Sequence, residues 1–172
     1  RDSHDSDLED REIWMRQTIN PIIDEYGVDV VYGHAHSYER SWYLNGHYGK
    51  SDTFDPALHA ELDSDGSPSY GQNDSPYQQI SPSTNLDNRT IYTVNGSSGG
   101  IGGDQDAACE GNVYVGCTMP DWLQHPAHRD FEPIYADFLP HGIESQGSVV
   151  LDANETELVS RFVDLHGEVL DY

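Results

Sequence analysis

The chain has 172 residues, and its 8 Lys+Arg against 31 Asp+Glu give a formal net charge of −23 and a sequence pI near 4.3. A surface this acidic repels phosphate backbones and anionic lipid headgroups, which excludes nucleic-acid or membrane-surface partners bound by bulk charge. The hydrophobic fraction of 35% is enough for a core, and no apolar run approaches the roughly 20 residues that a membrane span needs.

Residues 8–26 have the spacing of a helix, with acidic residues in the first turn, where the helix dipole favours them. The apolar side chains that share one helical face are Met15, Ile19, Ile22, Ile23 and Tyr26. Pro21 lies inside this pattern and predicts a kink or the start of a second helix. Gly27 predicts the helix end.

Residues 28–32 (Val-Asp-Val-Val-Tyr) predict a short strand that ends at Gly33. A helix that runs through one glycine into a near-continuous apolar strand is typical of a layered α/β fold, whose central strands are buried on both faces. We therefore expect residues 28–41 to form a central strand followed by a loop at its carboxyl end, where α/β sheets place their sites.

The rest of the chain divides into a long loop and a strand-rich part. Residues 44–90 have no periodic apolar pattern, which predicts a functional loop or lid that its tyrosines, with Trp42 and Phe54, attach to the body. Residues 91–172 begin with a strand and a Gly/Ser-rich turn. They end in three segments that predict an antiparallel meander, 148–151, 158–163 and 168–170.

Cys109 and Cys117 lie in a Gly/Asn-rich stretch. An even cysteine count at short separation favours a disulfide in an oxidising compartment over the alternative, a pair of reduced surface thiols. Asn-x-Ser/Thr sequons fit secretion weakly, because such short motifs arise by chance, and they begin at Asn73, Asn88, Asn95 and Asn154. One lysine beside twenty aspartates also indicates a saline or extracellular setting.

Residues 33–40, Gly-His-Ala-His-Ser-Tyr-Glu-Arg, carry the pattern most suited to chemistry. Residues i and i+2 of an extended chain point the same way, so His34 and His36 are expected to converge on one volume. Imidazole is the commonest metal ligand, and the negative net charge favours a cation. The residues alone leave a metal-ligand pair and a solvated turn equally open.

The helix, the strand and this octapeptide resemble the C-terminal metal-binding block of the calcineurin-like metallophosphoesterases, specifically the purple acid phosphatase-like branch. In that family a Gly-His-x-His-x-Tyr-Glu-Arg segment follows a hydrophobic strand. The resemblance is close over residues 21–41 and loose over most of the remaining chain. It implies that residues 1–172 are the C-terminal portion of one catalytic domain, a four-layer α/β/β/α sandwich that ends in antiparallel strands.

The resemblance also implies roles for the site residues. His34 would bind the more exchangeable divalent metal and His36 the other metal, in a dinuclear centre of iron with zinc, manganese or iron that acts on small phosphate esters. Tyr38, Glu39 and Arg40 would support the ligands, with a surface salt bridge as an equal alternative for Glu39 and Arg40. His4 lies where family members often carry a catalytic histidine that contacts phosphate or protonates the leaving group, although the loose alignment there favours an exposed histidine among acids.

The family's other ligand blocks, an Asp-x-His, a Gly-Asp, a Gly-Asn-His and a further histidine, have no counterpart in this sequence. Because catalytic metal sites use three or more protein ligands per metal, we expect the chain to be an inactive fragment of a phosphomonoesterase-like enzyme. The alternative is a non-catalytic, secreted acidic module that binds calcium. Residues 52–74 are rich in Asp and Asn but lack the ordered Asp-x-Asp-x-Asp-Gly pattern of a calcium loop.

Overall fold

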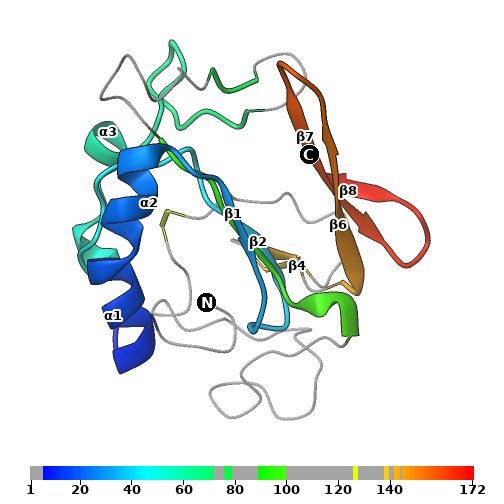
Figure 1. Ribbon diagram of the computed structural model, residues 1–172, viewed down its shortest axis with the longest axis horizontal. Helices are drawn as coiled ribbons and strands as arrows, with labels where there is room; N and C mark the ends of the chain where they lie inside the picture. Colours follow the sequence, from blue (N-terminus) through cyan, green and yellow to red (C-terminus); the bar gives the residue numbers. More distant parts are fainter. Residues whose placement is uncertain are drawn as a thin grey trace.

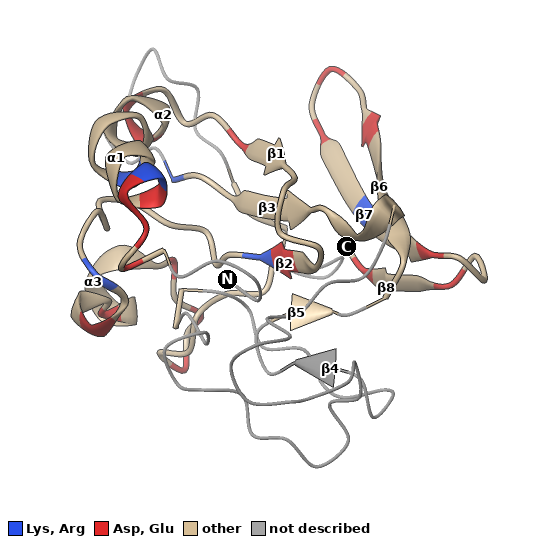
Figure 2. Ribbon diagram, turned by 90° about the horizontal axis from the view of Figure 1, so that it is seen from below, with Lys and Arg blue, Asp and Glu red and all other residues tan. Residues whose placement is uncertain are grey.

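A computed structural model of the chain describes residues 6–71, 76–78, 89–99, 126–127, 138–139, 142–143 and 145–172. Over these residues the fold is mixed α/β and contains two sheets (Figure 1). Helices α1 (Asp10–Thr18) and α2 (Asn20–Tyr26) lie on one side of a five-stranded sheet, and a three-stranded sheet lies on the other. Figure 2 shows the same order of layers from a second direction.

The two helices meet where the sequence predicts. α1 ends at Thr18, and α2 begins at Asn20 with Pro21 in its first turn, so the prediction of a restart is confirmed. Proline fits there because the first turn of a helix needs no backbone N–H donor. Gly27 closes α2 with a left-handed φ of 57°, which confirms the predicted helix end.

The predicted apolar helix face is not a buried face. Met15, Ile22 and Tyr26 are 42%, 53% and 58% exposed, and Asp24 is the buried residue of α2. The carboxylate of Asp24 accepts hydrogen bonds from the backbone N–H of Gly46 and from two tyrosine hydroxyls, those of Tyr48 and Tyr92. Polar contacts through Asp24 therefore attach α2 to the sheet, and hydrophobic spacing could not predict that.

The five-stranded sheet has the order β1-β3-β2-β5-β4. β1 (Val30–Tyr32) pairs parallel with β3 (Tyr92–Asn95), and β2 (Tyr38–Arg40) pairs antiparallel with the other side of β3. β5 (Gly142–Ile143) and the two-residue β4 (Phe138–Leu139) complete the sheet. β3 follows the long loop in sequence but lies between the two strands that flank residues 33–37.

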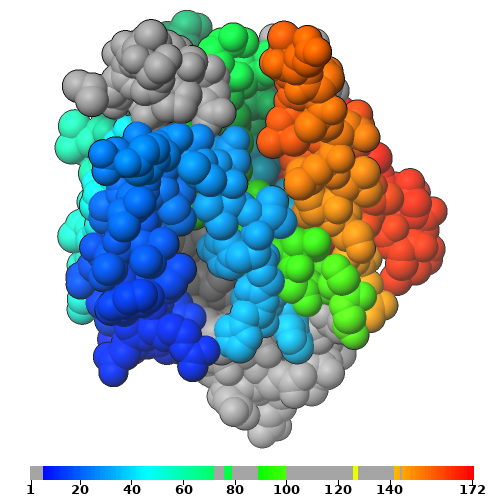
Figure 3. All heavy atoms as spheres, viewed as in Figure 1, coloured from blue at the N-terminus to red at the C-terminus, as the bar shows by residue number. Residues whose placement is uncertain are grey.

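The prediction that residues 28–32 form a central, doubly buried strand is wrong. Within the described residues β1 is an edge strand, and Val31 and Tyr32 are each 46% exposed. Figure 3 shows the α1–α2 pair and the β1–β2 segment together on one face of the molecule. An apolar run predicts that a strand forms, but pairing partners that are distant in sequence decide its place in the sheet.

The C-terminal sheet confirms the predicted meander. β6 (Gly147–Ala153), β7 (Leu158–Asp164) and β8 (Val169–Asp171) pair antiparallel in chain order. Tyr38 of β2 stacks on Phe162 of β7 with ring centroids 4.2 Å apart, and Ile143 completes the buried cluster between the sheets. Through Tyr38, this cluster joins β2, which directly follows the histidine loop, to the three-stranded sheet.

A second core cluster holds the described part of the long loop. It contains Trp42, Leu44, Ala60 and Ala127, with Phe54 and Tyr92 packed against it. The loop forms two short elements of its own, a 3-10 helix η1 (Ser51–Thr53) and a helix α3 (Pro56–His59). The predicted attachment is confirmed by ring contacts from Trp42 to Tyr70 and from Tyr43 to Tyr77. No helix in the described part of the chain has the length and hydropathy to cross a bilayer.

Candidate metal centre

Residues 33–37 connect β1 to β2 and contain both predicted metal ligands. His34 and His36 are exposed, whereas the residues that follow them, Ala35 and Ser37, are 8% and 0% exposed. Residues 34–37 bend instead of continuing the strand, so the i, i+2 geometry of an extended chain does not apply to them, but both imidazoles are exposed beyond the carboxyl end of β1. The two rings are therefore accessible to a ligand.

His34 has an unusual backbone conformation. Its φ of 96° lies in the left-handed region, which non-glycine residues rarely adopt. Such a conformation costs of order 1–3 kcal/mol and persists only where surrounding contacts enforce it. The loop is therefore held by its neighbours in a strained shape.

The turn after β3 supplies one of those contacts. The N–H of Gly96 donates to the Ser37 carbonyl oxygen over 3.1 Å. A side chain at Gly96 would overlap the carbonyl oxygen of Ala35, so glycine is required for this close approach. The Gly/Ser-rich turn recognised in the sequence thus lies directly against the histidine loop, a role that no local sequence signal indicates.

β2 supplies the contacts on the other side. Glu39 and Arg40 are 3% and 4% exposed, so the alternative of a surface salt bridge between them is wrong. Glu39 accepts a hydrogen bond from Ser37 Oγ over 2.8 Å, which ties the strand to the residue after His36. As neighbours in a strand, Glu39 and Arg40 point to opposite faces of the sheet.

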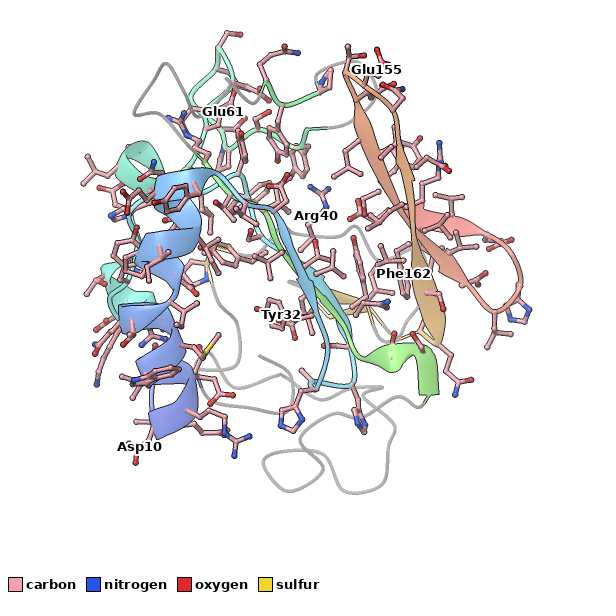
Figure 4. The ribbon with its side chains drawn as sticks, in the orientation of Figure 1. Asp10, Tyr32, Arg40, Glu61, Glu155 and Phe162 are labelled. Atoms are coloured by element: carbon pink, nitrogen blue, oxygen red, sulfur yellow. The ribbon has the colours of Figure 1, made fainter. Side chains whose placement is uncertain are left out.

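Arg40 points toward the three-stranded sheet and forms a forked ion pair with Asp171. Its Nε donates to Asp171 Oδ2 over 2.6 Å, and its Nη2 donates to Oδ1 over 3.0 Å. The Tyr38 hydroxyl donates to the same Oδ2 over 2.8 Å. Burial opposes the charge of Arg40, but the Asp171 carboxylate outweighs it and holds the pKa of Arg40 above its ordinary value. Figure 4 shows Arg40 and Phe162 in the space between the two sheets.

Tyr32 lies on the opposite, helix-facing side of the sheet (Figure 4). Burial raises the pKa of Tyr32, and the carboxylates of Glu39 and Glu12 raise it further.

Five of the predicted site residues lie in the described part of the chain, and three do not. Two of the five, His34 and His36, lie in the loop between β1 and β2, and the other three form β2 itself: Tyr38, Glu39 and Arg40. His4, Cys109 and Cys117 lie outside the described residues, so their predicted roles stay predictions. Sequence reasoning missed Asp171, which is 131 residues from Arg40 and has no local signal of its role.

The donor set fits part of a metal site. Two imidazoles suit zinc, iron, copper or nickel. Among the described residues, however, no group of three or more His, Cys, Asp or Glu side chains could hold a metal ion. The ligands present therefore fit a metal only together with others, as the sequence leads us to expect.

Comparisons with protein family models, with curated proteins and with solved structures find no match.

Proposed function

We propose that this chain is the C-terminal portion of a metal-dependent phosphoesterase and contributes two ligands to a dinuclear centre. The observation that carries the proposal is the loop at residues 33–37, which presents two exposed imidazoles at the carboxyl end of a strand. The strained backbone of His34 supports the hypothesis that this loop is a functional site, because strain is retained where function needs a fixed geometry.

In the proposed centre His34 would hold the exchangeable divalent metal and His36 the metal at the iron position. Such a centre would supply hydroxide near neutral pH and positive charge to offset the negative charge that builds up on the phosphoryl group. The protein's own residues orient the ligands. Glu39 fixes Ser37 through its hydrogen bond, and Gly96 fixes the same residue through its backbone N–H.

The proposal also includes a four-layer sandwich fold and secretion of the protein. In the proposed α/β/β/α sandwich, the helices, the five-stranded sheet and the three-stranded sheet would be three of the four layers. Secretion is proposed from the acidic composition, and the sequon at Asn154 is compatible with it because it lies exposed in the turn between β6 and β7. The sequon at Asn95 supports it less, since Asn95 is part of β3 and its side-chain oxygen is buried.

In the described part of residues 52–74, the contacts of Asp55 and Asp65 do not favour the calcium-binding alternative. The Asp55 carboxylate accepts the N–H of Ala57 at the start of α3, and Asp65 accepts the N–H and the hydroxyl of Ser67. Both carboxylates therefore act as turn and helix caps.

Metal binding tests the ligand assignment. We expect the complete protein to bind Zn²⁺ or Co²⁺, and His34→Ala or His36→Ala to weaken binding at least about tenfold, because each substitution removes one protein ligand of the centre. Isothermal titration calorimetry measures the affinity. The matched control is His166→Ala, an exposed histidine in the turn between β7 and β8. Equal affinity in all four proteins contradicts the assignment.

Activity tests the proposal for the complete protein. There we expect the same two substitutions to lower phosphomonoesterase turnover at least about 100-fold, since metals supply several kcal/mol of transition-state stabilisation. The full gene is expected to encode Gly-Asp and Gly-Asn-His blocks upstream of Arg1. A complete open reading frame without such blocks overturns the proposal.

A further inference from the structure

The buried ion pair between β2 and β8 connects the C-terminal end of the described chain to the histidine loop. Asp171 is 2% exposed and receives three hydrogen bonds from β2, two from the Arg40 guanidinium and one from the Tyr38 hydroxyl. Side chains that form a forked, charge-assisted pair fix both the distance and the relative angle of the groups they join. Asp171 therefore determines where β2 lies relative to the three-stranded sheet.

The position of β2 sets the position of the loop. Tyr38 directly follows Ser37, so the first residue of β2 is two positions from His36. Tyr38 is fixed at both ends of its side chain, because its ring stacks on Phe162 and its hydroxyl binds Asp171. On the opposite side of β2, Glu39 holds Ser37. A displacement of β2 would therefore be transmitted to both histidines over a few covalent bonds.

A carboxylate is required at this position. Oδ2 accepts from both Arg40 Nε and Tyr38, while Oδ1 accepts from Arg40 Nη2. An asparagine would present an NH₂ group, a donor, to at least one of these donors. It would also leave the guanidinium buried without its counter-charge.

We infer that Asp171 is a positioning residue of the proposed metal site, which holds the His34–His36 loop in its binding geometry through Tyr38 and Arg40. This role rests on the proposed function, because it presupposes that His34 and His36 bind a metal. The positioning itself concerns only residues of this chain and can be measured without any metal.

The test compares four forms of the full chain: the original sequence, Asp171→Asn, Tyr38→Phe and the control Asp152→Asn. Tyr38→Phe removes one of the three hydrogen bonds and keeps the stacked ring. Asp152 pairs with Arg161 at the surface of the same sheet, so the control also removes an Asp–Arg ion pair but not one that contacts β2. Measurements are made at a temperature at which thermal unfolding curves show every form to be folded.

The first readout is the backbone order parameter of residues 33–37 from ¹⁵N relaxation. We expect values near 0.85, typical of rigid backbone, in the original chain and in Asp152→Asn, and values below about 0.6 in Asp171→Asn. A smaller decrease is expected in Tyr38→Phe. Order parameters in β6 and β7 should not change, which separates loop positioning from general loosening.

The second readout, made on the same four forms of the complete protein, is Co²⁺ affinity and the d–d absorption of the bound ion. Loss of a residue that orients metal ligands lowers affinity by about 10–100-fold, and we expect this range for Asp171→Asn together with an altered spectrum. If Asp171→Asn does not fold, the test uses the loop order and Co²⁺ binding of Tyr38→Phe instead. A folded variant with the original loop order and Co²⁺ spectrum overturns the inference. If the loop becomes disordered in Asp171→Asn and the complete protein with the original sequence binds no metal, the positioning role is upheld and the proposed function is contradicted.

Discussion

At the scale of single residues, Gly96 shows how the turn after β3 acts on the candidate site. Its N–H binds the Ser37 carbonyl, and the space that a side chain would need is filled by the backbone of Ala35. Gly99, three residues on, has no atom within 4 Å of the position that a Cβ would take. The two glycines therefore form a natural pair for comparison.

We expect Gly96→Ala to lower the free energy of unfolding by about 1–3 kcal/mol, the usual effect of forcing an extra carbon into a packed site. Because the displaced backbone belongs to the histidine loop, metal affinity should decrease as well. Gly99→Ala should stay within about 0.5 kcal/mol of the original chain. Urea denaturation and calorimetric titration measure both effects, and equal behaviour of the two variants would show that Gly96 does not hold the loop.

At the scale of elements, the segment from His47 to α3 forms an aromatic cluster of its own. The ring of His47 lies 5.3 Å from that of Phe54 and 4.9 Å from that of His59, centroid to centroid. Asp55 caps α3 and its N–H donates to His59 Nδ1, which fixes the second histidine. Burial first, and then the neighbouring His59, hold the pKa of His47 below its ordinary value of 6.5.

This lowered pKa predicts a loss of stability in weak acid. Above pH 6.5 His47 is neutral in both the folded and the unfolded chain, so its contribution is complete. As the pH decreases below 6.5, the unfolded chain binds a proton that folded His47 does not yet accept, and the free energy of unfolding decreases until the folded pKa is reached.

Urea denaturation from about pH 7.5 to about pH 5.5 measures this loss. We expect a smaller decrease in His47→Gln than in the original chain, while His166→Gln, altered in the exposed turn between β7 and β8, keeps the original slope. A His47→Gln variant with an unchanged slope contradicts the assigned role of His47.

At the scale of the whole molecule, the charge of −23 is spread over the fold. Figure 2 shows acidic segments in the helices, in the loops and at the ends of the C-terminal strands. Arg40, one of only 8 basic residues, is buried in the pair with Asp171, and Arg161 pairs with Asp152. The remaining acidic groups repel one another, and this repulsion opposes compactness.

Salt should therefore stabilise the chain. Raising NaCl to about 1 M shortens the Debye length to about 3 Å and screens the repulsion. We expect the melting temperature at neutral pH to increase by at least about 4 °C, which corresponds to roughly 1–2 kcal/mol for a chain of this size. The same salt series near the sequence pI of 4.3, where the net charge approaches zero, is the control and should give a smaller increase. A melting temperature that does not respond to salt at neutral pH contradicts the electrostatic argument.

Local features could be predicted from the sequence wherever a few neighbouring residues decide the structure. Pro21 and Gly27 mark the start and end of α2 because backbone sterics act within one turn. The C-terminal meander follows from alternating strands joined by short turns.

Features that depend on distant parts of the chain could not be predicted in this way. The helix face formed by Met15, Ile22 and Tyr26 is exposed, since hydrophobic spacing shows which side chains lie together but not whether another layer covers them. The edge position of β1 depends on β3, which follows it by some sixty residues, as its register of Val30 with Tyr92 shows.

The sequence by itself determined the junction of α1 and α2, the C-terminal meander and the acidic character of this protein, because these depend on neighbouring residues or on composition. Only the tertiary structure decided that Arg40 faces Asp171, that Gly96 lies on the histidine loop and that Asp24 attaches the helices to the sheet. Each of these is a polar or steric contact between segments distant in sequence. A linear pattern contains no signal for such contacts until the chain has folded.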